Sequence, residues 1–485
     1  MGPDEQLEGL RRENEQLREE NALLRAELEA LRSRLAELEQ RLAKSSANSS
    51  LPPSSDRPGQ RAAARTSRAE RRAEERAAQK EQRRRGKQPG TDGEHLARRE
   101  DPDEVVVHDI ERCGDCGEDV TGAPIESVEV RQVFDVPAPA VVTTEHRVHK
   151  RRCACGALAS APFPAEARAP TCYGPNIRAI ACYLMHAQHL PVERTKAALF
   201  EMAGVEVSTG FLSSLAPEAA RGLSNFIAAL KARLVGSRLV HVDETSDQVG
   251  TATWWLHVVS NEKLTYLYAD RTRGKAAPDA AGVLPFFTGT MVHDRLALYF
   301  GYEGAAHGLC GAHLVRNLAS VAHRPSQAWA ERMRRLLLET NKACHAARDR
   351  GSRRLPAKEL EAFLSSYDEL VGTGLRANRP LLSRERNSLE RESYNLVVAL
   401  RDRRVEVTRF ACDLAVPFTN NEAERSLRMA KLHHKISGCF QSERHARAFA
   451  TIRSYLATAR KHGVGDLFVL GRLFRGDPWM PPAVT

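Results

Sequence analysis

Two aspartates stand where the sequence otherwise predicts buried β-strands. Asp243 follows the apolar run LVHV with no turn signal before Gly250, and Asp294 ends the run GTMVHD. Burying a carboxylate in an apolar strand is costly unless a cation pairs with it. If a sheet brings the two carboxylates together, they suggest a site for a divalent metal ion.

The elements that must position these aspartates can be read between residues 237 and 294. The stretches SRLVHVDETSDQV, TATWWLHVVS and KLTYLYAD predict three successive strands, and GTMVHD predicts a fourth after a short helical crossover. Asp243 then lies on the first strand, and Asp294 lies at the end of the fourth.

A third acidic residue is expected on a helix that begins within VPFTNNEAERSLRMAK. Pro417 ends the preceding segment, and Asn420 or Asn421 caps the helix. Glu422 and Glu424 are the two candidate acids. With Asn421 as the cap, Glu424 would stand at a capping-box position that needs no catalysis. Acids on a first strand, after a fourth strand and on a later helix describe an α/β catalytic core of the ribonuclease-H-like type, in which two Mg²⁺ ions roughly 4 Å apart flank a scissile phosphate.

The segment YEGAAHGLCGAHLVRNL is predicted to be a helix that carries Cys310 and His313 three residues apart. This pair either binds a metal or packs and caps the helix. Helical periodicity follows, so an all-helical insertion over 321–410 is expected to divide the catalytic core into a first part, 236–320, and a second part, 411–485, with C-terminal helices.

Four cysteines form two close pairs in the region 101–165, where we expect a strand-rich domain. The pairs, each on a Gly-containing turn, are Cys113 with Cys116 and Cys153 with Cys155. Thiolates on two tight turns can converge tetrahedrally, so the pattern predicts a zinc ribbon with a structural Zn²⁺ ion. The second pair departs from the usual spacing because it is Cys-x-Cys. Four unrelated buried cysteines are the alternative.

Residues 7–42 repeat with heptad spacing. One heptad position holds Leu7, Asn14, Asn21, Leu28, Leu35 and Leu42, and the position three further on holds Leu10, Leu17, Leu24, Leu31 and Leu38. Such heptads, with Glu and Arg between them, predict a leucine-zipper coiled coil over 1–44, and asparagine at two core positions favours a parallel homodimer. A long single helix packed on its own domain is the alternative.

The net charge of +10 is concentrated in the segment 45–100, which is predicted to be a basic, disordered linker. Between residues 57 and 88 there are twelve Arg and Lys against four Glu. We expect this segment to contact DNA, either as a solvated charge run or by laying side chains along phosphates or into a minor groove. The residues singled out for this contact are Arg83, Arg84, Arg85 and Lys87.

The region 166–235 is predicted to be helical and to bind DNA. A helix that ends at Gly204, a short turn, and a second helix capped by Ser208 form a helix-turn-helix pattern. A plain helical hairpin fits the same residues.

The composition indicates a protein of the cytoplasm. The 485 residues are 42 % hydrophobic and contain no run of about eighteen apolar residues, so no membrane partner is expected. Charged residues at the N-terminus exclude a secretory signal, and ten cysteines without one indicate a reducing compartment.

These motifs together resemble an insertion-sequence transposase of family sixty-six, of the type with an Asp-Asp-Glu catalytic triad. The resemblance covers almost the whole chain: the zipper, NSSLPPSSD, GKQPG, the cysteine pairs, YGPNIRA, LPVERT, HVDET, VHD, CGAH and VPFTNNEAER. The last motif is the most specific, because the family pattern is Asn-Asn, two residues, then Glu-Arg. It assigns the catalytic glutamate to Glu424, followed by Arg425.

The resemblance implies a bacterial, nucleoid-associated enzyme that cuts and joins DNA at terminal inverted repeats and transfers strands into target DNA. It implies that Asp243, Asp294 and Glu424 hold two Mg²⁺ or Mn²⁺ ions. Residues expected to support the site or contact DNA are His313, Arg425, Arg428 and Lys431. Whether accessory proteins of the same element are needed stays open. The rival interpretations are a catalytically inactive zinc-ribbon, coiled-coil DNA-binding regulator and a nuclease without strand transfer.

Overall fold

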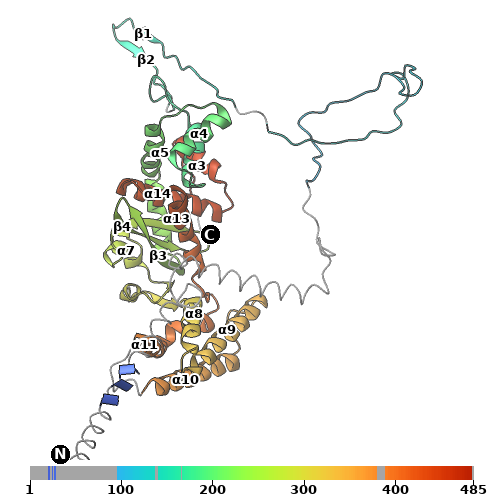
Figure 1. The fold of residues 1–485 in the computed structure, drawn as a ribbon. Coiled ribbons are helices and arrows are strands. Elements are labelled where there is room, and N and C mark those ends of the chain that lie inside the picture. The colour runs from blue at the N-terminus through green and yellow to red at the C-terminus, as the bar shows by residue number, and fades with distance from the viewer. Residues whose placement is uncertain are drawn as a thin grey trace, which may run out of the picture. The chain divides into compact units, whose positions relative to one another are not determined.

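The computed structural model describes residues 96–136, 140–164, 166–379 and 388–482, together with residues 20, 21, 24, 25, 27 and 28 (Figure 1). Most of the heptad segment and the basic residues Arg83, Arg84, Arg85 and Lys87 lie outside them. The chain divides into two units, residues 61–141 and the remainder. No helix in the described part is long and apolar enough to cross a membrane.

Within the unit of residues 61–141, the described stretch 96–136 forms turns and one isolated bridge, between Arg112 and Asp119. The run VEVRQVFDV, residues 128–136, alternates like a strand of the expected strand-rich domain, but no strand forms there, and Val128 and Val133 are 74 % and 91 % exposed. Alternating apolar residues make a strand only where a partner strand and a core cover one face. No strand pairs with this stretch among the described residues of its unit.

A five-stranded mixed sheet forms the centre of the larger unit. Its strands are β3 (Leu239–Val249), β4 (Ala252–Ser260), β5 (Thr265–Asp270), β6 (Thr290–His293) and β7 (Ala306–Leu309). They lie in the order β5-β4-β3-β6-β7, with β3, β4 and β5 antiparallel and β6 and β7 parallel to β3. The first four strands are those predicted from the sequence.

The fifth strand corrects the sequence prediction. Residues 306–309 were expected to be helical, but they form β7, and the helix α8 begins only at Gly311 and ends at Ala322. The short run AHGL has no alternation of its own, and its pairing with β6 decides its conformation. Cys310 is consequently the residue that precedes the helix, and His313 lies in its first turn.

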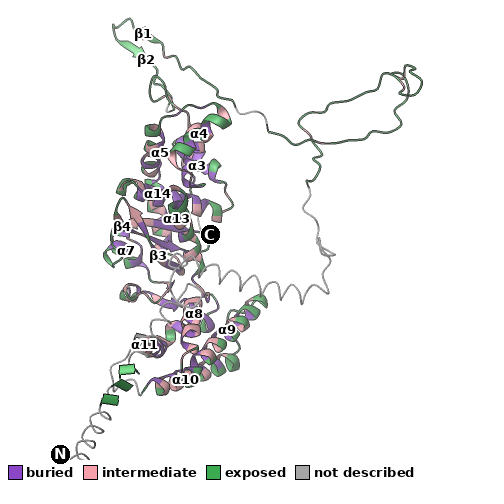
Figure 2. Cartoon of the chain, viewed as in Figure 1, coloured by how far each residue is buried: buried purple, intermediate pink, exposed green. Residues whose placement is uncertain are grey.

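Helices from both ends of the unit cover the sheet. On one face, Leu256, Val258 and Leu267 pack against α13 (Asn421–Ser437) and α14 (Glu443–Lys461). The helices α3 (Pro175–His186), α4 (Val192–Ala203), α5 (Thr209–Gly222) and α6 (Ser224–Val235) share one core with α14 and α15 (Asp466–Phe474), as Figure 1 shows for segments far apart in sequence. Figure 2 shows this packed interior as buried residues.

The outer edge of the sheet is closed by α14. The main-chain N–H groups of Thr265 and Leu267 on β5 donate to the hydroxyl oxygens of Thr458 and Ser454, at 3.1 and 2.8 Å. An edge strand with unpaired N–H groups is a template for association, and these two hydroxyls satisfy donors that no sixth strand pairs. The helix is thereby fixed along β5.

Four helices lie between α8 and α13 and have a core of their own. They are α9 (Ala328–Asp349), α10 (Ala357–Asn378), α11 (Ser388–Asp402) and α12 (Arg404–Cys412). Trp329, Tyr367 and Val397 are buried among them. The guanidinium of Arg348 donates to the main-chain oxygens of Leu414 and Val416 and so ties α9 to the segment that leads into α13.

The helix boundaries predicted near residue 204 are present. Gly204 ends α4 in the left-handed conformation, with φ of 64°, which suits a residue without a Cβ atom. The Ser208 side chain accepts a hydrogen bond from the N–H of Phe211 at 3.1 Å and caps α5.

The helix α13 is attached to β3 at both ends. At its start, the fully buried Asn420 donates from Nδ2 to the oxygen of Val242 at 2.8 Å, and its Oδ1 lies 3.0 Å from Nδ1 of His241. After its end, Phe440 donates a main-chain hydrogen bond to Gln248 of β3 and accepts one from Gly250, which follows that strand. Seventeen helical residues span roughly 26 Å, and the stretch of β3 from Val242 to Gln248 spans about 20 Å, so helix and strand run side by side.

We predict that Asn420→Ala lowers the free energy of unfolding by about 2–4 kcal/mol, because each buried partner left without its hydrogen bond costs about 1–3 kcal/mol. Urea denaturation followed by circular dichroism measures the change. The neighbouring, exposed Asn421 is the matched control, and Asn421→Ala should stay within about 0.5 kcal/mol of the wild type. Equal stabilities for the two variants would contradict this role of Asn420.

Candidate functional site

The two aspartates lie next to each other where the pairing between the inner strands β3 and β6 ends. The last paired residues of the parallel strands β3 and β6 are His241 and Val292. Asp243 and Asp294 each stand two residues beyond this pair, so the register places them side by side. Asp294 also accepts a hydrogen bond from the N–H of Leu296 at 2.9 Å, which fixes the turn after β6.

The electrostatics of Asp243 show which acids surround it. Its pKa is raised well above the ordinary value, first by burial and then by the carboxylates of Glu244, Asp294 and Glu424. The N–H of Glu244 donates to its Oδ1 at 2.9 Å and opposes the shift. Asp294 and Glu424 therefore lie near enough to Asp243 for their charges to affect it.

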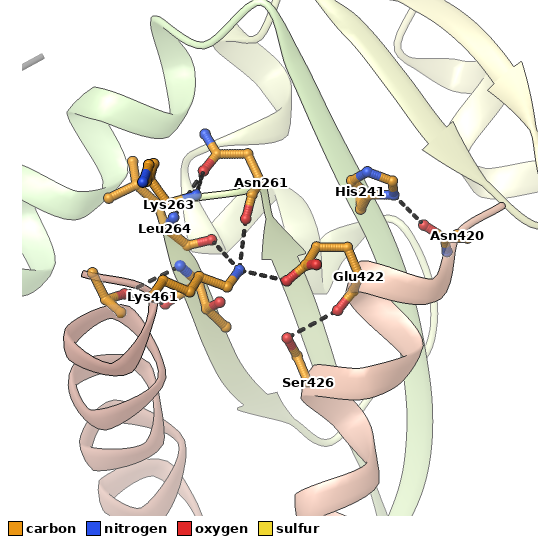
Figure 3. A network of polar contacts seen from close by, with 10 residues as sticks. His241, Asn261, Lys263, Leu264, Asn420, Glu422, Ser426 and Lys461 are labelled. Carbon is orange, nitrogen blue, oxygen red and sulfur yellow. Dashed lines mark hydrogen bonds and ion pairs between the residues drawn. The ribbon is translucent and has the colours of Figure 1, made fainter. Parts of the chain in front are cut away.

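Of the two candidate glutamates on α13, Glu422 has a structural partner. Its Oε1 lies 2.8 Å from Nζ of Lys461, which also donates to the main-chain oxygens of Asn261 and Leu264 at 2.6 and 3.0 Å. Figure 3 shows this network joining α13, α14 and the turn between β4 and β5. The charge of Glu422 is compensated there, away from Asp243.

Glu424 is left without such a partner. The residue that precedes the helix is Asn420, so Glu424 is the fourth helical residue, and the capping-box alternative does not apply. The Asn420 side chain makes no capping hydrogen bond and points into the core instead. Oε1 of Glu424 is buried without a hydrogen-bond partner among the described residues and lies 3.7 Å from Nδ1 of His313.

The positively charged residues near these acids come from α13 and from the turn after β6, where Arg295 interacts with Asp294. Burial lowers the pKa of Lys431, while the charges of Asp243 and Glu424 oppose this shift. Arg425 and Arg428 are exposed on the same helix. Burial and the charge of Arg316 lower the pKa of His313, while Glu424 opposes the shift.

Glu244 is a site residue that the sequence did not single out. Its side chain is 2 % exposed and binds Arg273, whose Nη2 lies 2.8 Å from Oε1, and Tyr299, whose hydroxyl donates to Oε2 at 2.7 Å. Alternation along β3 predicts that Glu244 points away from Asp243. The only signal in the sequence that could have pointed to Glu244 was its position directly after Asp243. Glu244 thus has its own cation and is not free to bind another.

The remaining acids fit divalent metal ions. Carboxylate oxygens are the donors that Mg²⁺ prefers. Here burial and the charges of Glu244, Asp294 and Glu424 raise the pKa of Asp243, and Oε1 of Glu424 is buried without a hydrogen-bond partner among the described residues. The residues that would hold such ions are Asp243, Asp294 and Glu424.

The two cysteine pairs each lie on a hydrogen-bonded turn that contains a glycine, and each turn lies within its own unit. Cys113 accepts a main-chain hydrogen bond from Gly117 at 2.9 Å, and Cys153 accepts one from Gly156 at 2.9 Å, with positive φ at both glycines. Hydrogen bonds from the turn lower the pKa of both first thiols; the donors are the backbone of Cys116 for Cys113 and that of Cys155 for Cys153. Strands β1 (Lys150–Arg152) and β2 (Leu158–Ser160) flank the second turn. Turns that stabilise thiolates are suited to zinc.

We predict that Asp243→Asn stabilises the protein at pH 7–8 without added divalent ions. Folding raises the pKa of Asp243, so the stability that it contributes is complete below the unfolded-chain value of about 3.9 and is lost as pH rises through the folded pKa. Each kcal/mol of added stability should raise the unfolding midpoint by about 2–4 °C.

Unfolding midpoints measured from pH 4 to pH 8 check this prediction. The gain should shrink toward zero as the pH approaches 4. The exposed Glu303 is the control, and Glu303→Gln should leave the pH profile unchanged. A gain of equal size at pH 4 and pH 8 would show that the charge of Asp243 is not its cause.

Models of three protein families match stretches of this chain. The family model for the Transposase IS66 family matches residues 170–448, more than half of the chain. The zinc-finger binding domain of transposase IS66 matches residues 111–156, and a family of unknown function matches residues 3–97. The uncharacterized protein y4hP of Sinorhizobium fredii is 27 % identical over 345 residues, which cover 64 % of this chain and 60 % of that protein, less than two thirds of its length.

The zinc-finger match includes all four cysteines of the two pairs and supports a structural zinc site in this part of the chain. The longer match includes both aspartates and Glu424. The chain belongs to the IS66 family of transposases.

Proposed function

We propose that this chain is a DNA transposase of the Asp-Asp-Glu type, which cuts and joins the ends of an insertion sequence by two-metal phosphoryl transfer. The observation that supports the proposal is that Asp243 and Asp294 stand in register on β3 and after β6, while Oε1 of the nearby Glu424 is buried without a hydrogen-bond partner among the described residues. The family membership supplies the substrate class, double-stranded DNA.

The sheet supports a ribonuclease-H-like catalytic core. Three antiparallel strands followed by two parallel ones, in the order β5-β4-β3-β6-β7, place the first acid on the central strand and the second after its parallel neighbour. The third acid arrives on α13, after the helices α9 to α12. The proposed domains follow: a catalytic core over 236–320 and 411–485, divided by a helical insertion over 321–410.

Each residue of the site has a separate proposed role in the reaction. Bound Mg²⁺ or Mn²⁺ would activate a water or a DNA 3′-hydroxyl and stabilise charge on the scissile phosphate. Asp243, central among the acids, would hold both ions, while Asp294 and Glu424 would each hold one. Arg425 and Arg428 are exposed beside Glu424 and are suited to phosphate oxygens. His313 would contact the scissile phosphate.

Recognition of terminal inverted repeats and target DNA is proposed for the parts that precede the core. Arg83, Arg84, Arg85 and Lys87 supply positive charge for phosphates. The helices α4 and α5 are proposed as a helix-turn-helix, and Cys113, Cys116, Cys153 and Cys155 as the ligands of one structural zinc ion.

We predict that Asp243→Asn, Asp294→Asn and Glu424→Gln each lower Mg²⁺-dependent cleavage of terminal-repeat DNA by more than about 100-fold. Loss of a direct metal ligand should exceed the 10–100-fold that follows loss of the groups that orient ligands. Denaturing gels of labelled DNA measure both cut and joined products.

Glu422→Gln is the control on the same helix, because Lys461 retains its two main-chain acceptors in that variant. It should stay within a few-fold of the wild type. Products from all proteins alike would reject the triad, whereas cutting without joining would indicate a nuclease. An absence of products with the wild type as well would favour the inactive regulator.

We propose in addition that the chain forms a homodimer through residues 7–42. Leu24 and Leu28, four residues apart, are helical and 55 % and 51 % exposed in the single chain. Two such side chains on one helical face are the pattern that a partner helix covers.

We predict that replacing Leu17 and Leu24 with proline halves the molar mass measured by sedimentation equilibrium. Proline breaks the helix and so removes the paired leucine stripe. Replacing the intervening Glu19 and Glu20 with alanine, outside the two leucine positions, is the control and should leave the mass at that of two chains. A wild type with the mass of one chain would exclude this dimer.

A further inference from the structure

A second group of metal-binding atoms lies beside the three carboxylates. The sulfur of Cys310, a ring nitrogen of His313 and a carboxylate oxygen of Glu424 all lie within 4.8 Å of one another. Cys310 and His313 come from the start of α8 and Glu424 from the start of α13. The sequence offered the first two residues without a third ligand, and the fold supplies it.

We propose that Cys310, His313 and Glu424 form a binding site for a thiophilic divalent transition-metal ion, of which Zn²⁺ is the example. The site shares Glu424 with the proposed Mg²⁺ site but does not use Asp243 or Asp294. On binding, the thiol of Cys310 forms a bond to the ion through sulfur and releases its proton to solvent.

The distances are close to those that zinc requires. Bonds of about 2.3 Å to sulfur and 2.0–2.2 Å to nitrogen and oxygen separate tetrahedral ligand atoms by roughly 3.3–3.7 Å. Nδ1 of His313 and Oε1 of Glu424 are 3.7 Å apart. The remaining separations, at most 4.8 Å, need shifts of about 1 Å, which side-chain rotation can supply.

The atoms that face this group lack other partners. Nδ1 of His313 and Oε1 of Glu424 are both buried without a hydrogen bond among the described residues. Buried polar atoms in native proteins are rarely left unpaired, and an ion is one of the explanations when they are. A purely structural role explains Cys310, which accepts a hydrogen bond from the N–H of Asn420 at 3.2 Å, but leaves the other two unexplained.

Burial raises the pKa of the Cys310 thiol to about 11, and main-chain N–H groups around the sulfur offset part of this shift. The residue precedes the twelve-residue helix α8, whose N-terminal N–H groups carry partial positive charge. The N–H of Asn420 points at the sulfur and would orient it as a ligand. A thiolate and an imidazole select zinc over Mg²⁺, which prefers oxygen.

One consequence rests on the proposed function. An ion held by Cys310 and His313 would occupy Glu424 and withdraw it from Asp243 and Asp294. Zinc should therefore inhibit Mg²⁺-dependent cleavage by the wild type at concentrations about 10-fold or more below those that inhibit Cys310→Ser, since loss of a ligand weakens metal binding at least that much.

The binding experiment needs no DNA and no activity. Full-length wild type and the variants Cys310→Ser, His313→Asn and Glu424→Gln are saturated with Zn²⁺ and freed of excess, and bound zinc is counted with a chromogenic chelator. Cys344→Ser is the matched control, because Cys344 is also fully buried but bonds only to the oxygen of Phe410. Loading with Co²⁺ then reports thiolate ligation through its near-ultraviolet charge-transfer absorption.

The wild type and Cys344→Ser should bind one zinc ion more per chain than each of the three variants. All five proteins keep the paired cysteines between residues 113 and 155, so zinc bound there does not change the difference between their zinc counts. Cys310→Ser should also lose part of the cobalt–thiolate absorption. Equal zinc counts in all five proteins would overturn the proposal. If Cys310→Ser does not fold, the zinc counts of His313→Asn and Glu424→Gln test the proposal in its place. None of these outcomes depends on whether the chain cuts DNA.

Discussion

The position of the third carboxylate depends on the hydrogen bonds of Asn420. This buried amide joins the start of α13 to His241 and Val242 of β3, one residue before Asp243. Phe440 secures the other end of the helix to the same strand. Glu424 is therefore fixed to the strand that carries the first aspartate, although the helical insertion separates them in sequence. A buried amide tolerates little displacement, because a lost partner costs about 1–3 kcal/mol.

Charge compensation distinguishes the acids around the candidate site. Glu244 has the guanidinium of Arg273, and Glu422 has the ammonium of Lys461. Asp243 and Glu424, in contrast, interact with the single ammonium of Lys431, and burial and repulsion raise the pKa of Asp243. Uncompensated charge of this kind is characteristic of functional sites, where it disfavours the ligand-free state and favours cation binding.

The sequence predicts what local patterns determine and fails where tertiary contacts decide. Four strands and the two aspartates follow from apolar runs, and Gly204 and Ser208 end and begin helices through their own backbone preferences. The choice between Glu422 and Glu424 needed the family motif, because only the folded chain shows Lys461 beside Glu422. Strand β7 forms by pairing with β6, although its residues were predicted to be helical. Residues 128–136 alternate like a strand but have no partner strand among the described residues of their unit.

The starts of α8 and α13 meet at the hydrogen bond from Asn420 to Cys310, beside the acids. Each helix N-terminus carries a partial positive charge, which stabilises a nearby carboxylate by about 0.3–1 kcal/mol. That is less than the roughly 1.4 kcal/mol that corresponds to one unit of pKa, whereas the pKa of Asp243 stays well above its ordinary value. The fold thus offsets only part of the repulsion that it creates. The repulsion that is not offset favours the binding of cations. Glu424 belongs both to the proposed Mg²⁺ site, with oxygen donors, and to the proposed zinc site, with a thiol and an imidazole. A hard and a soft ion would therefore compete for Glu424.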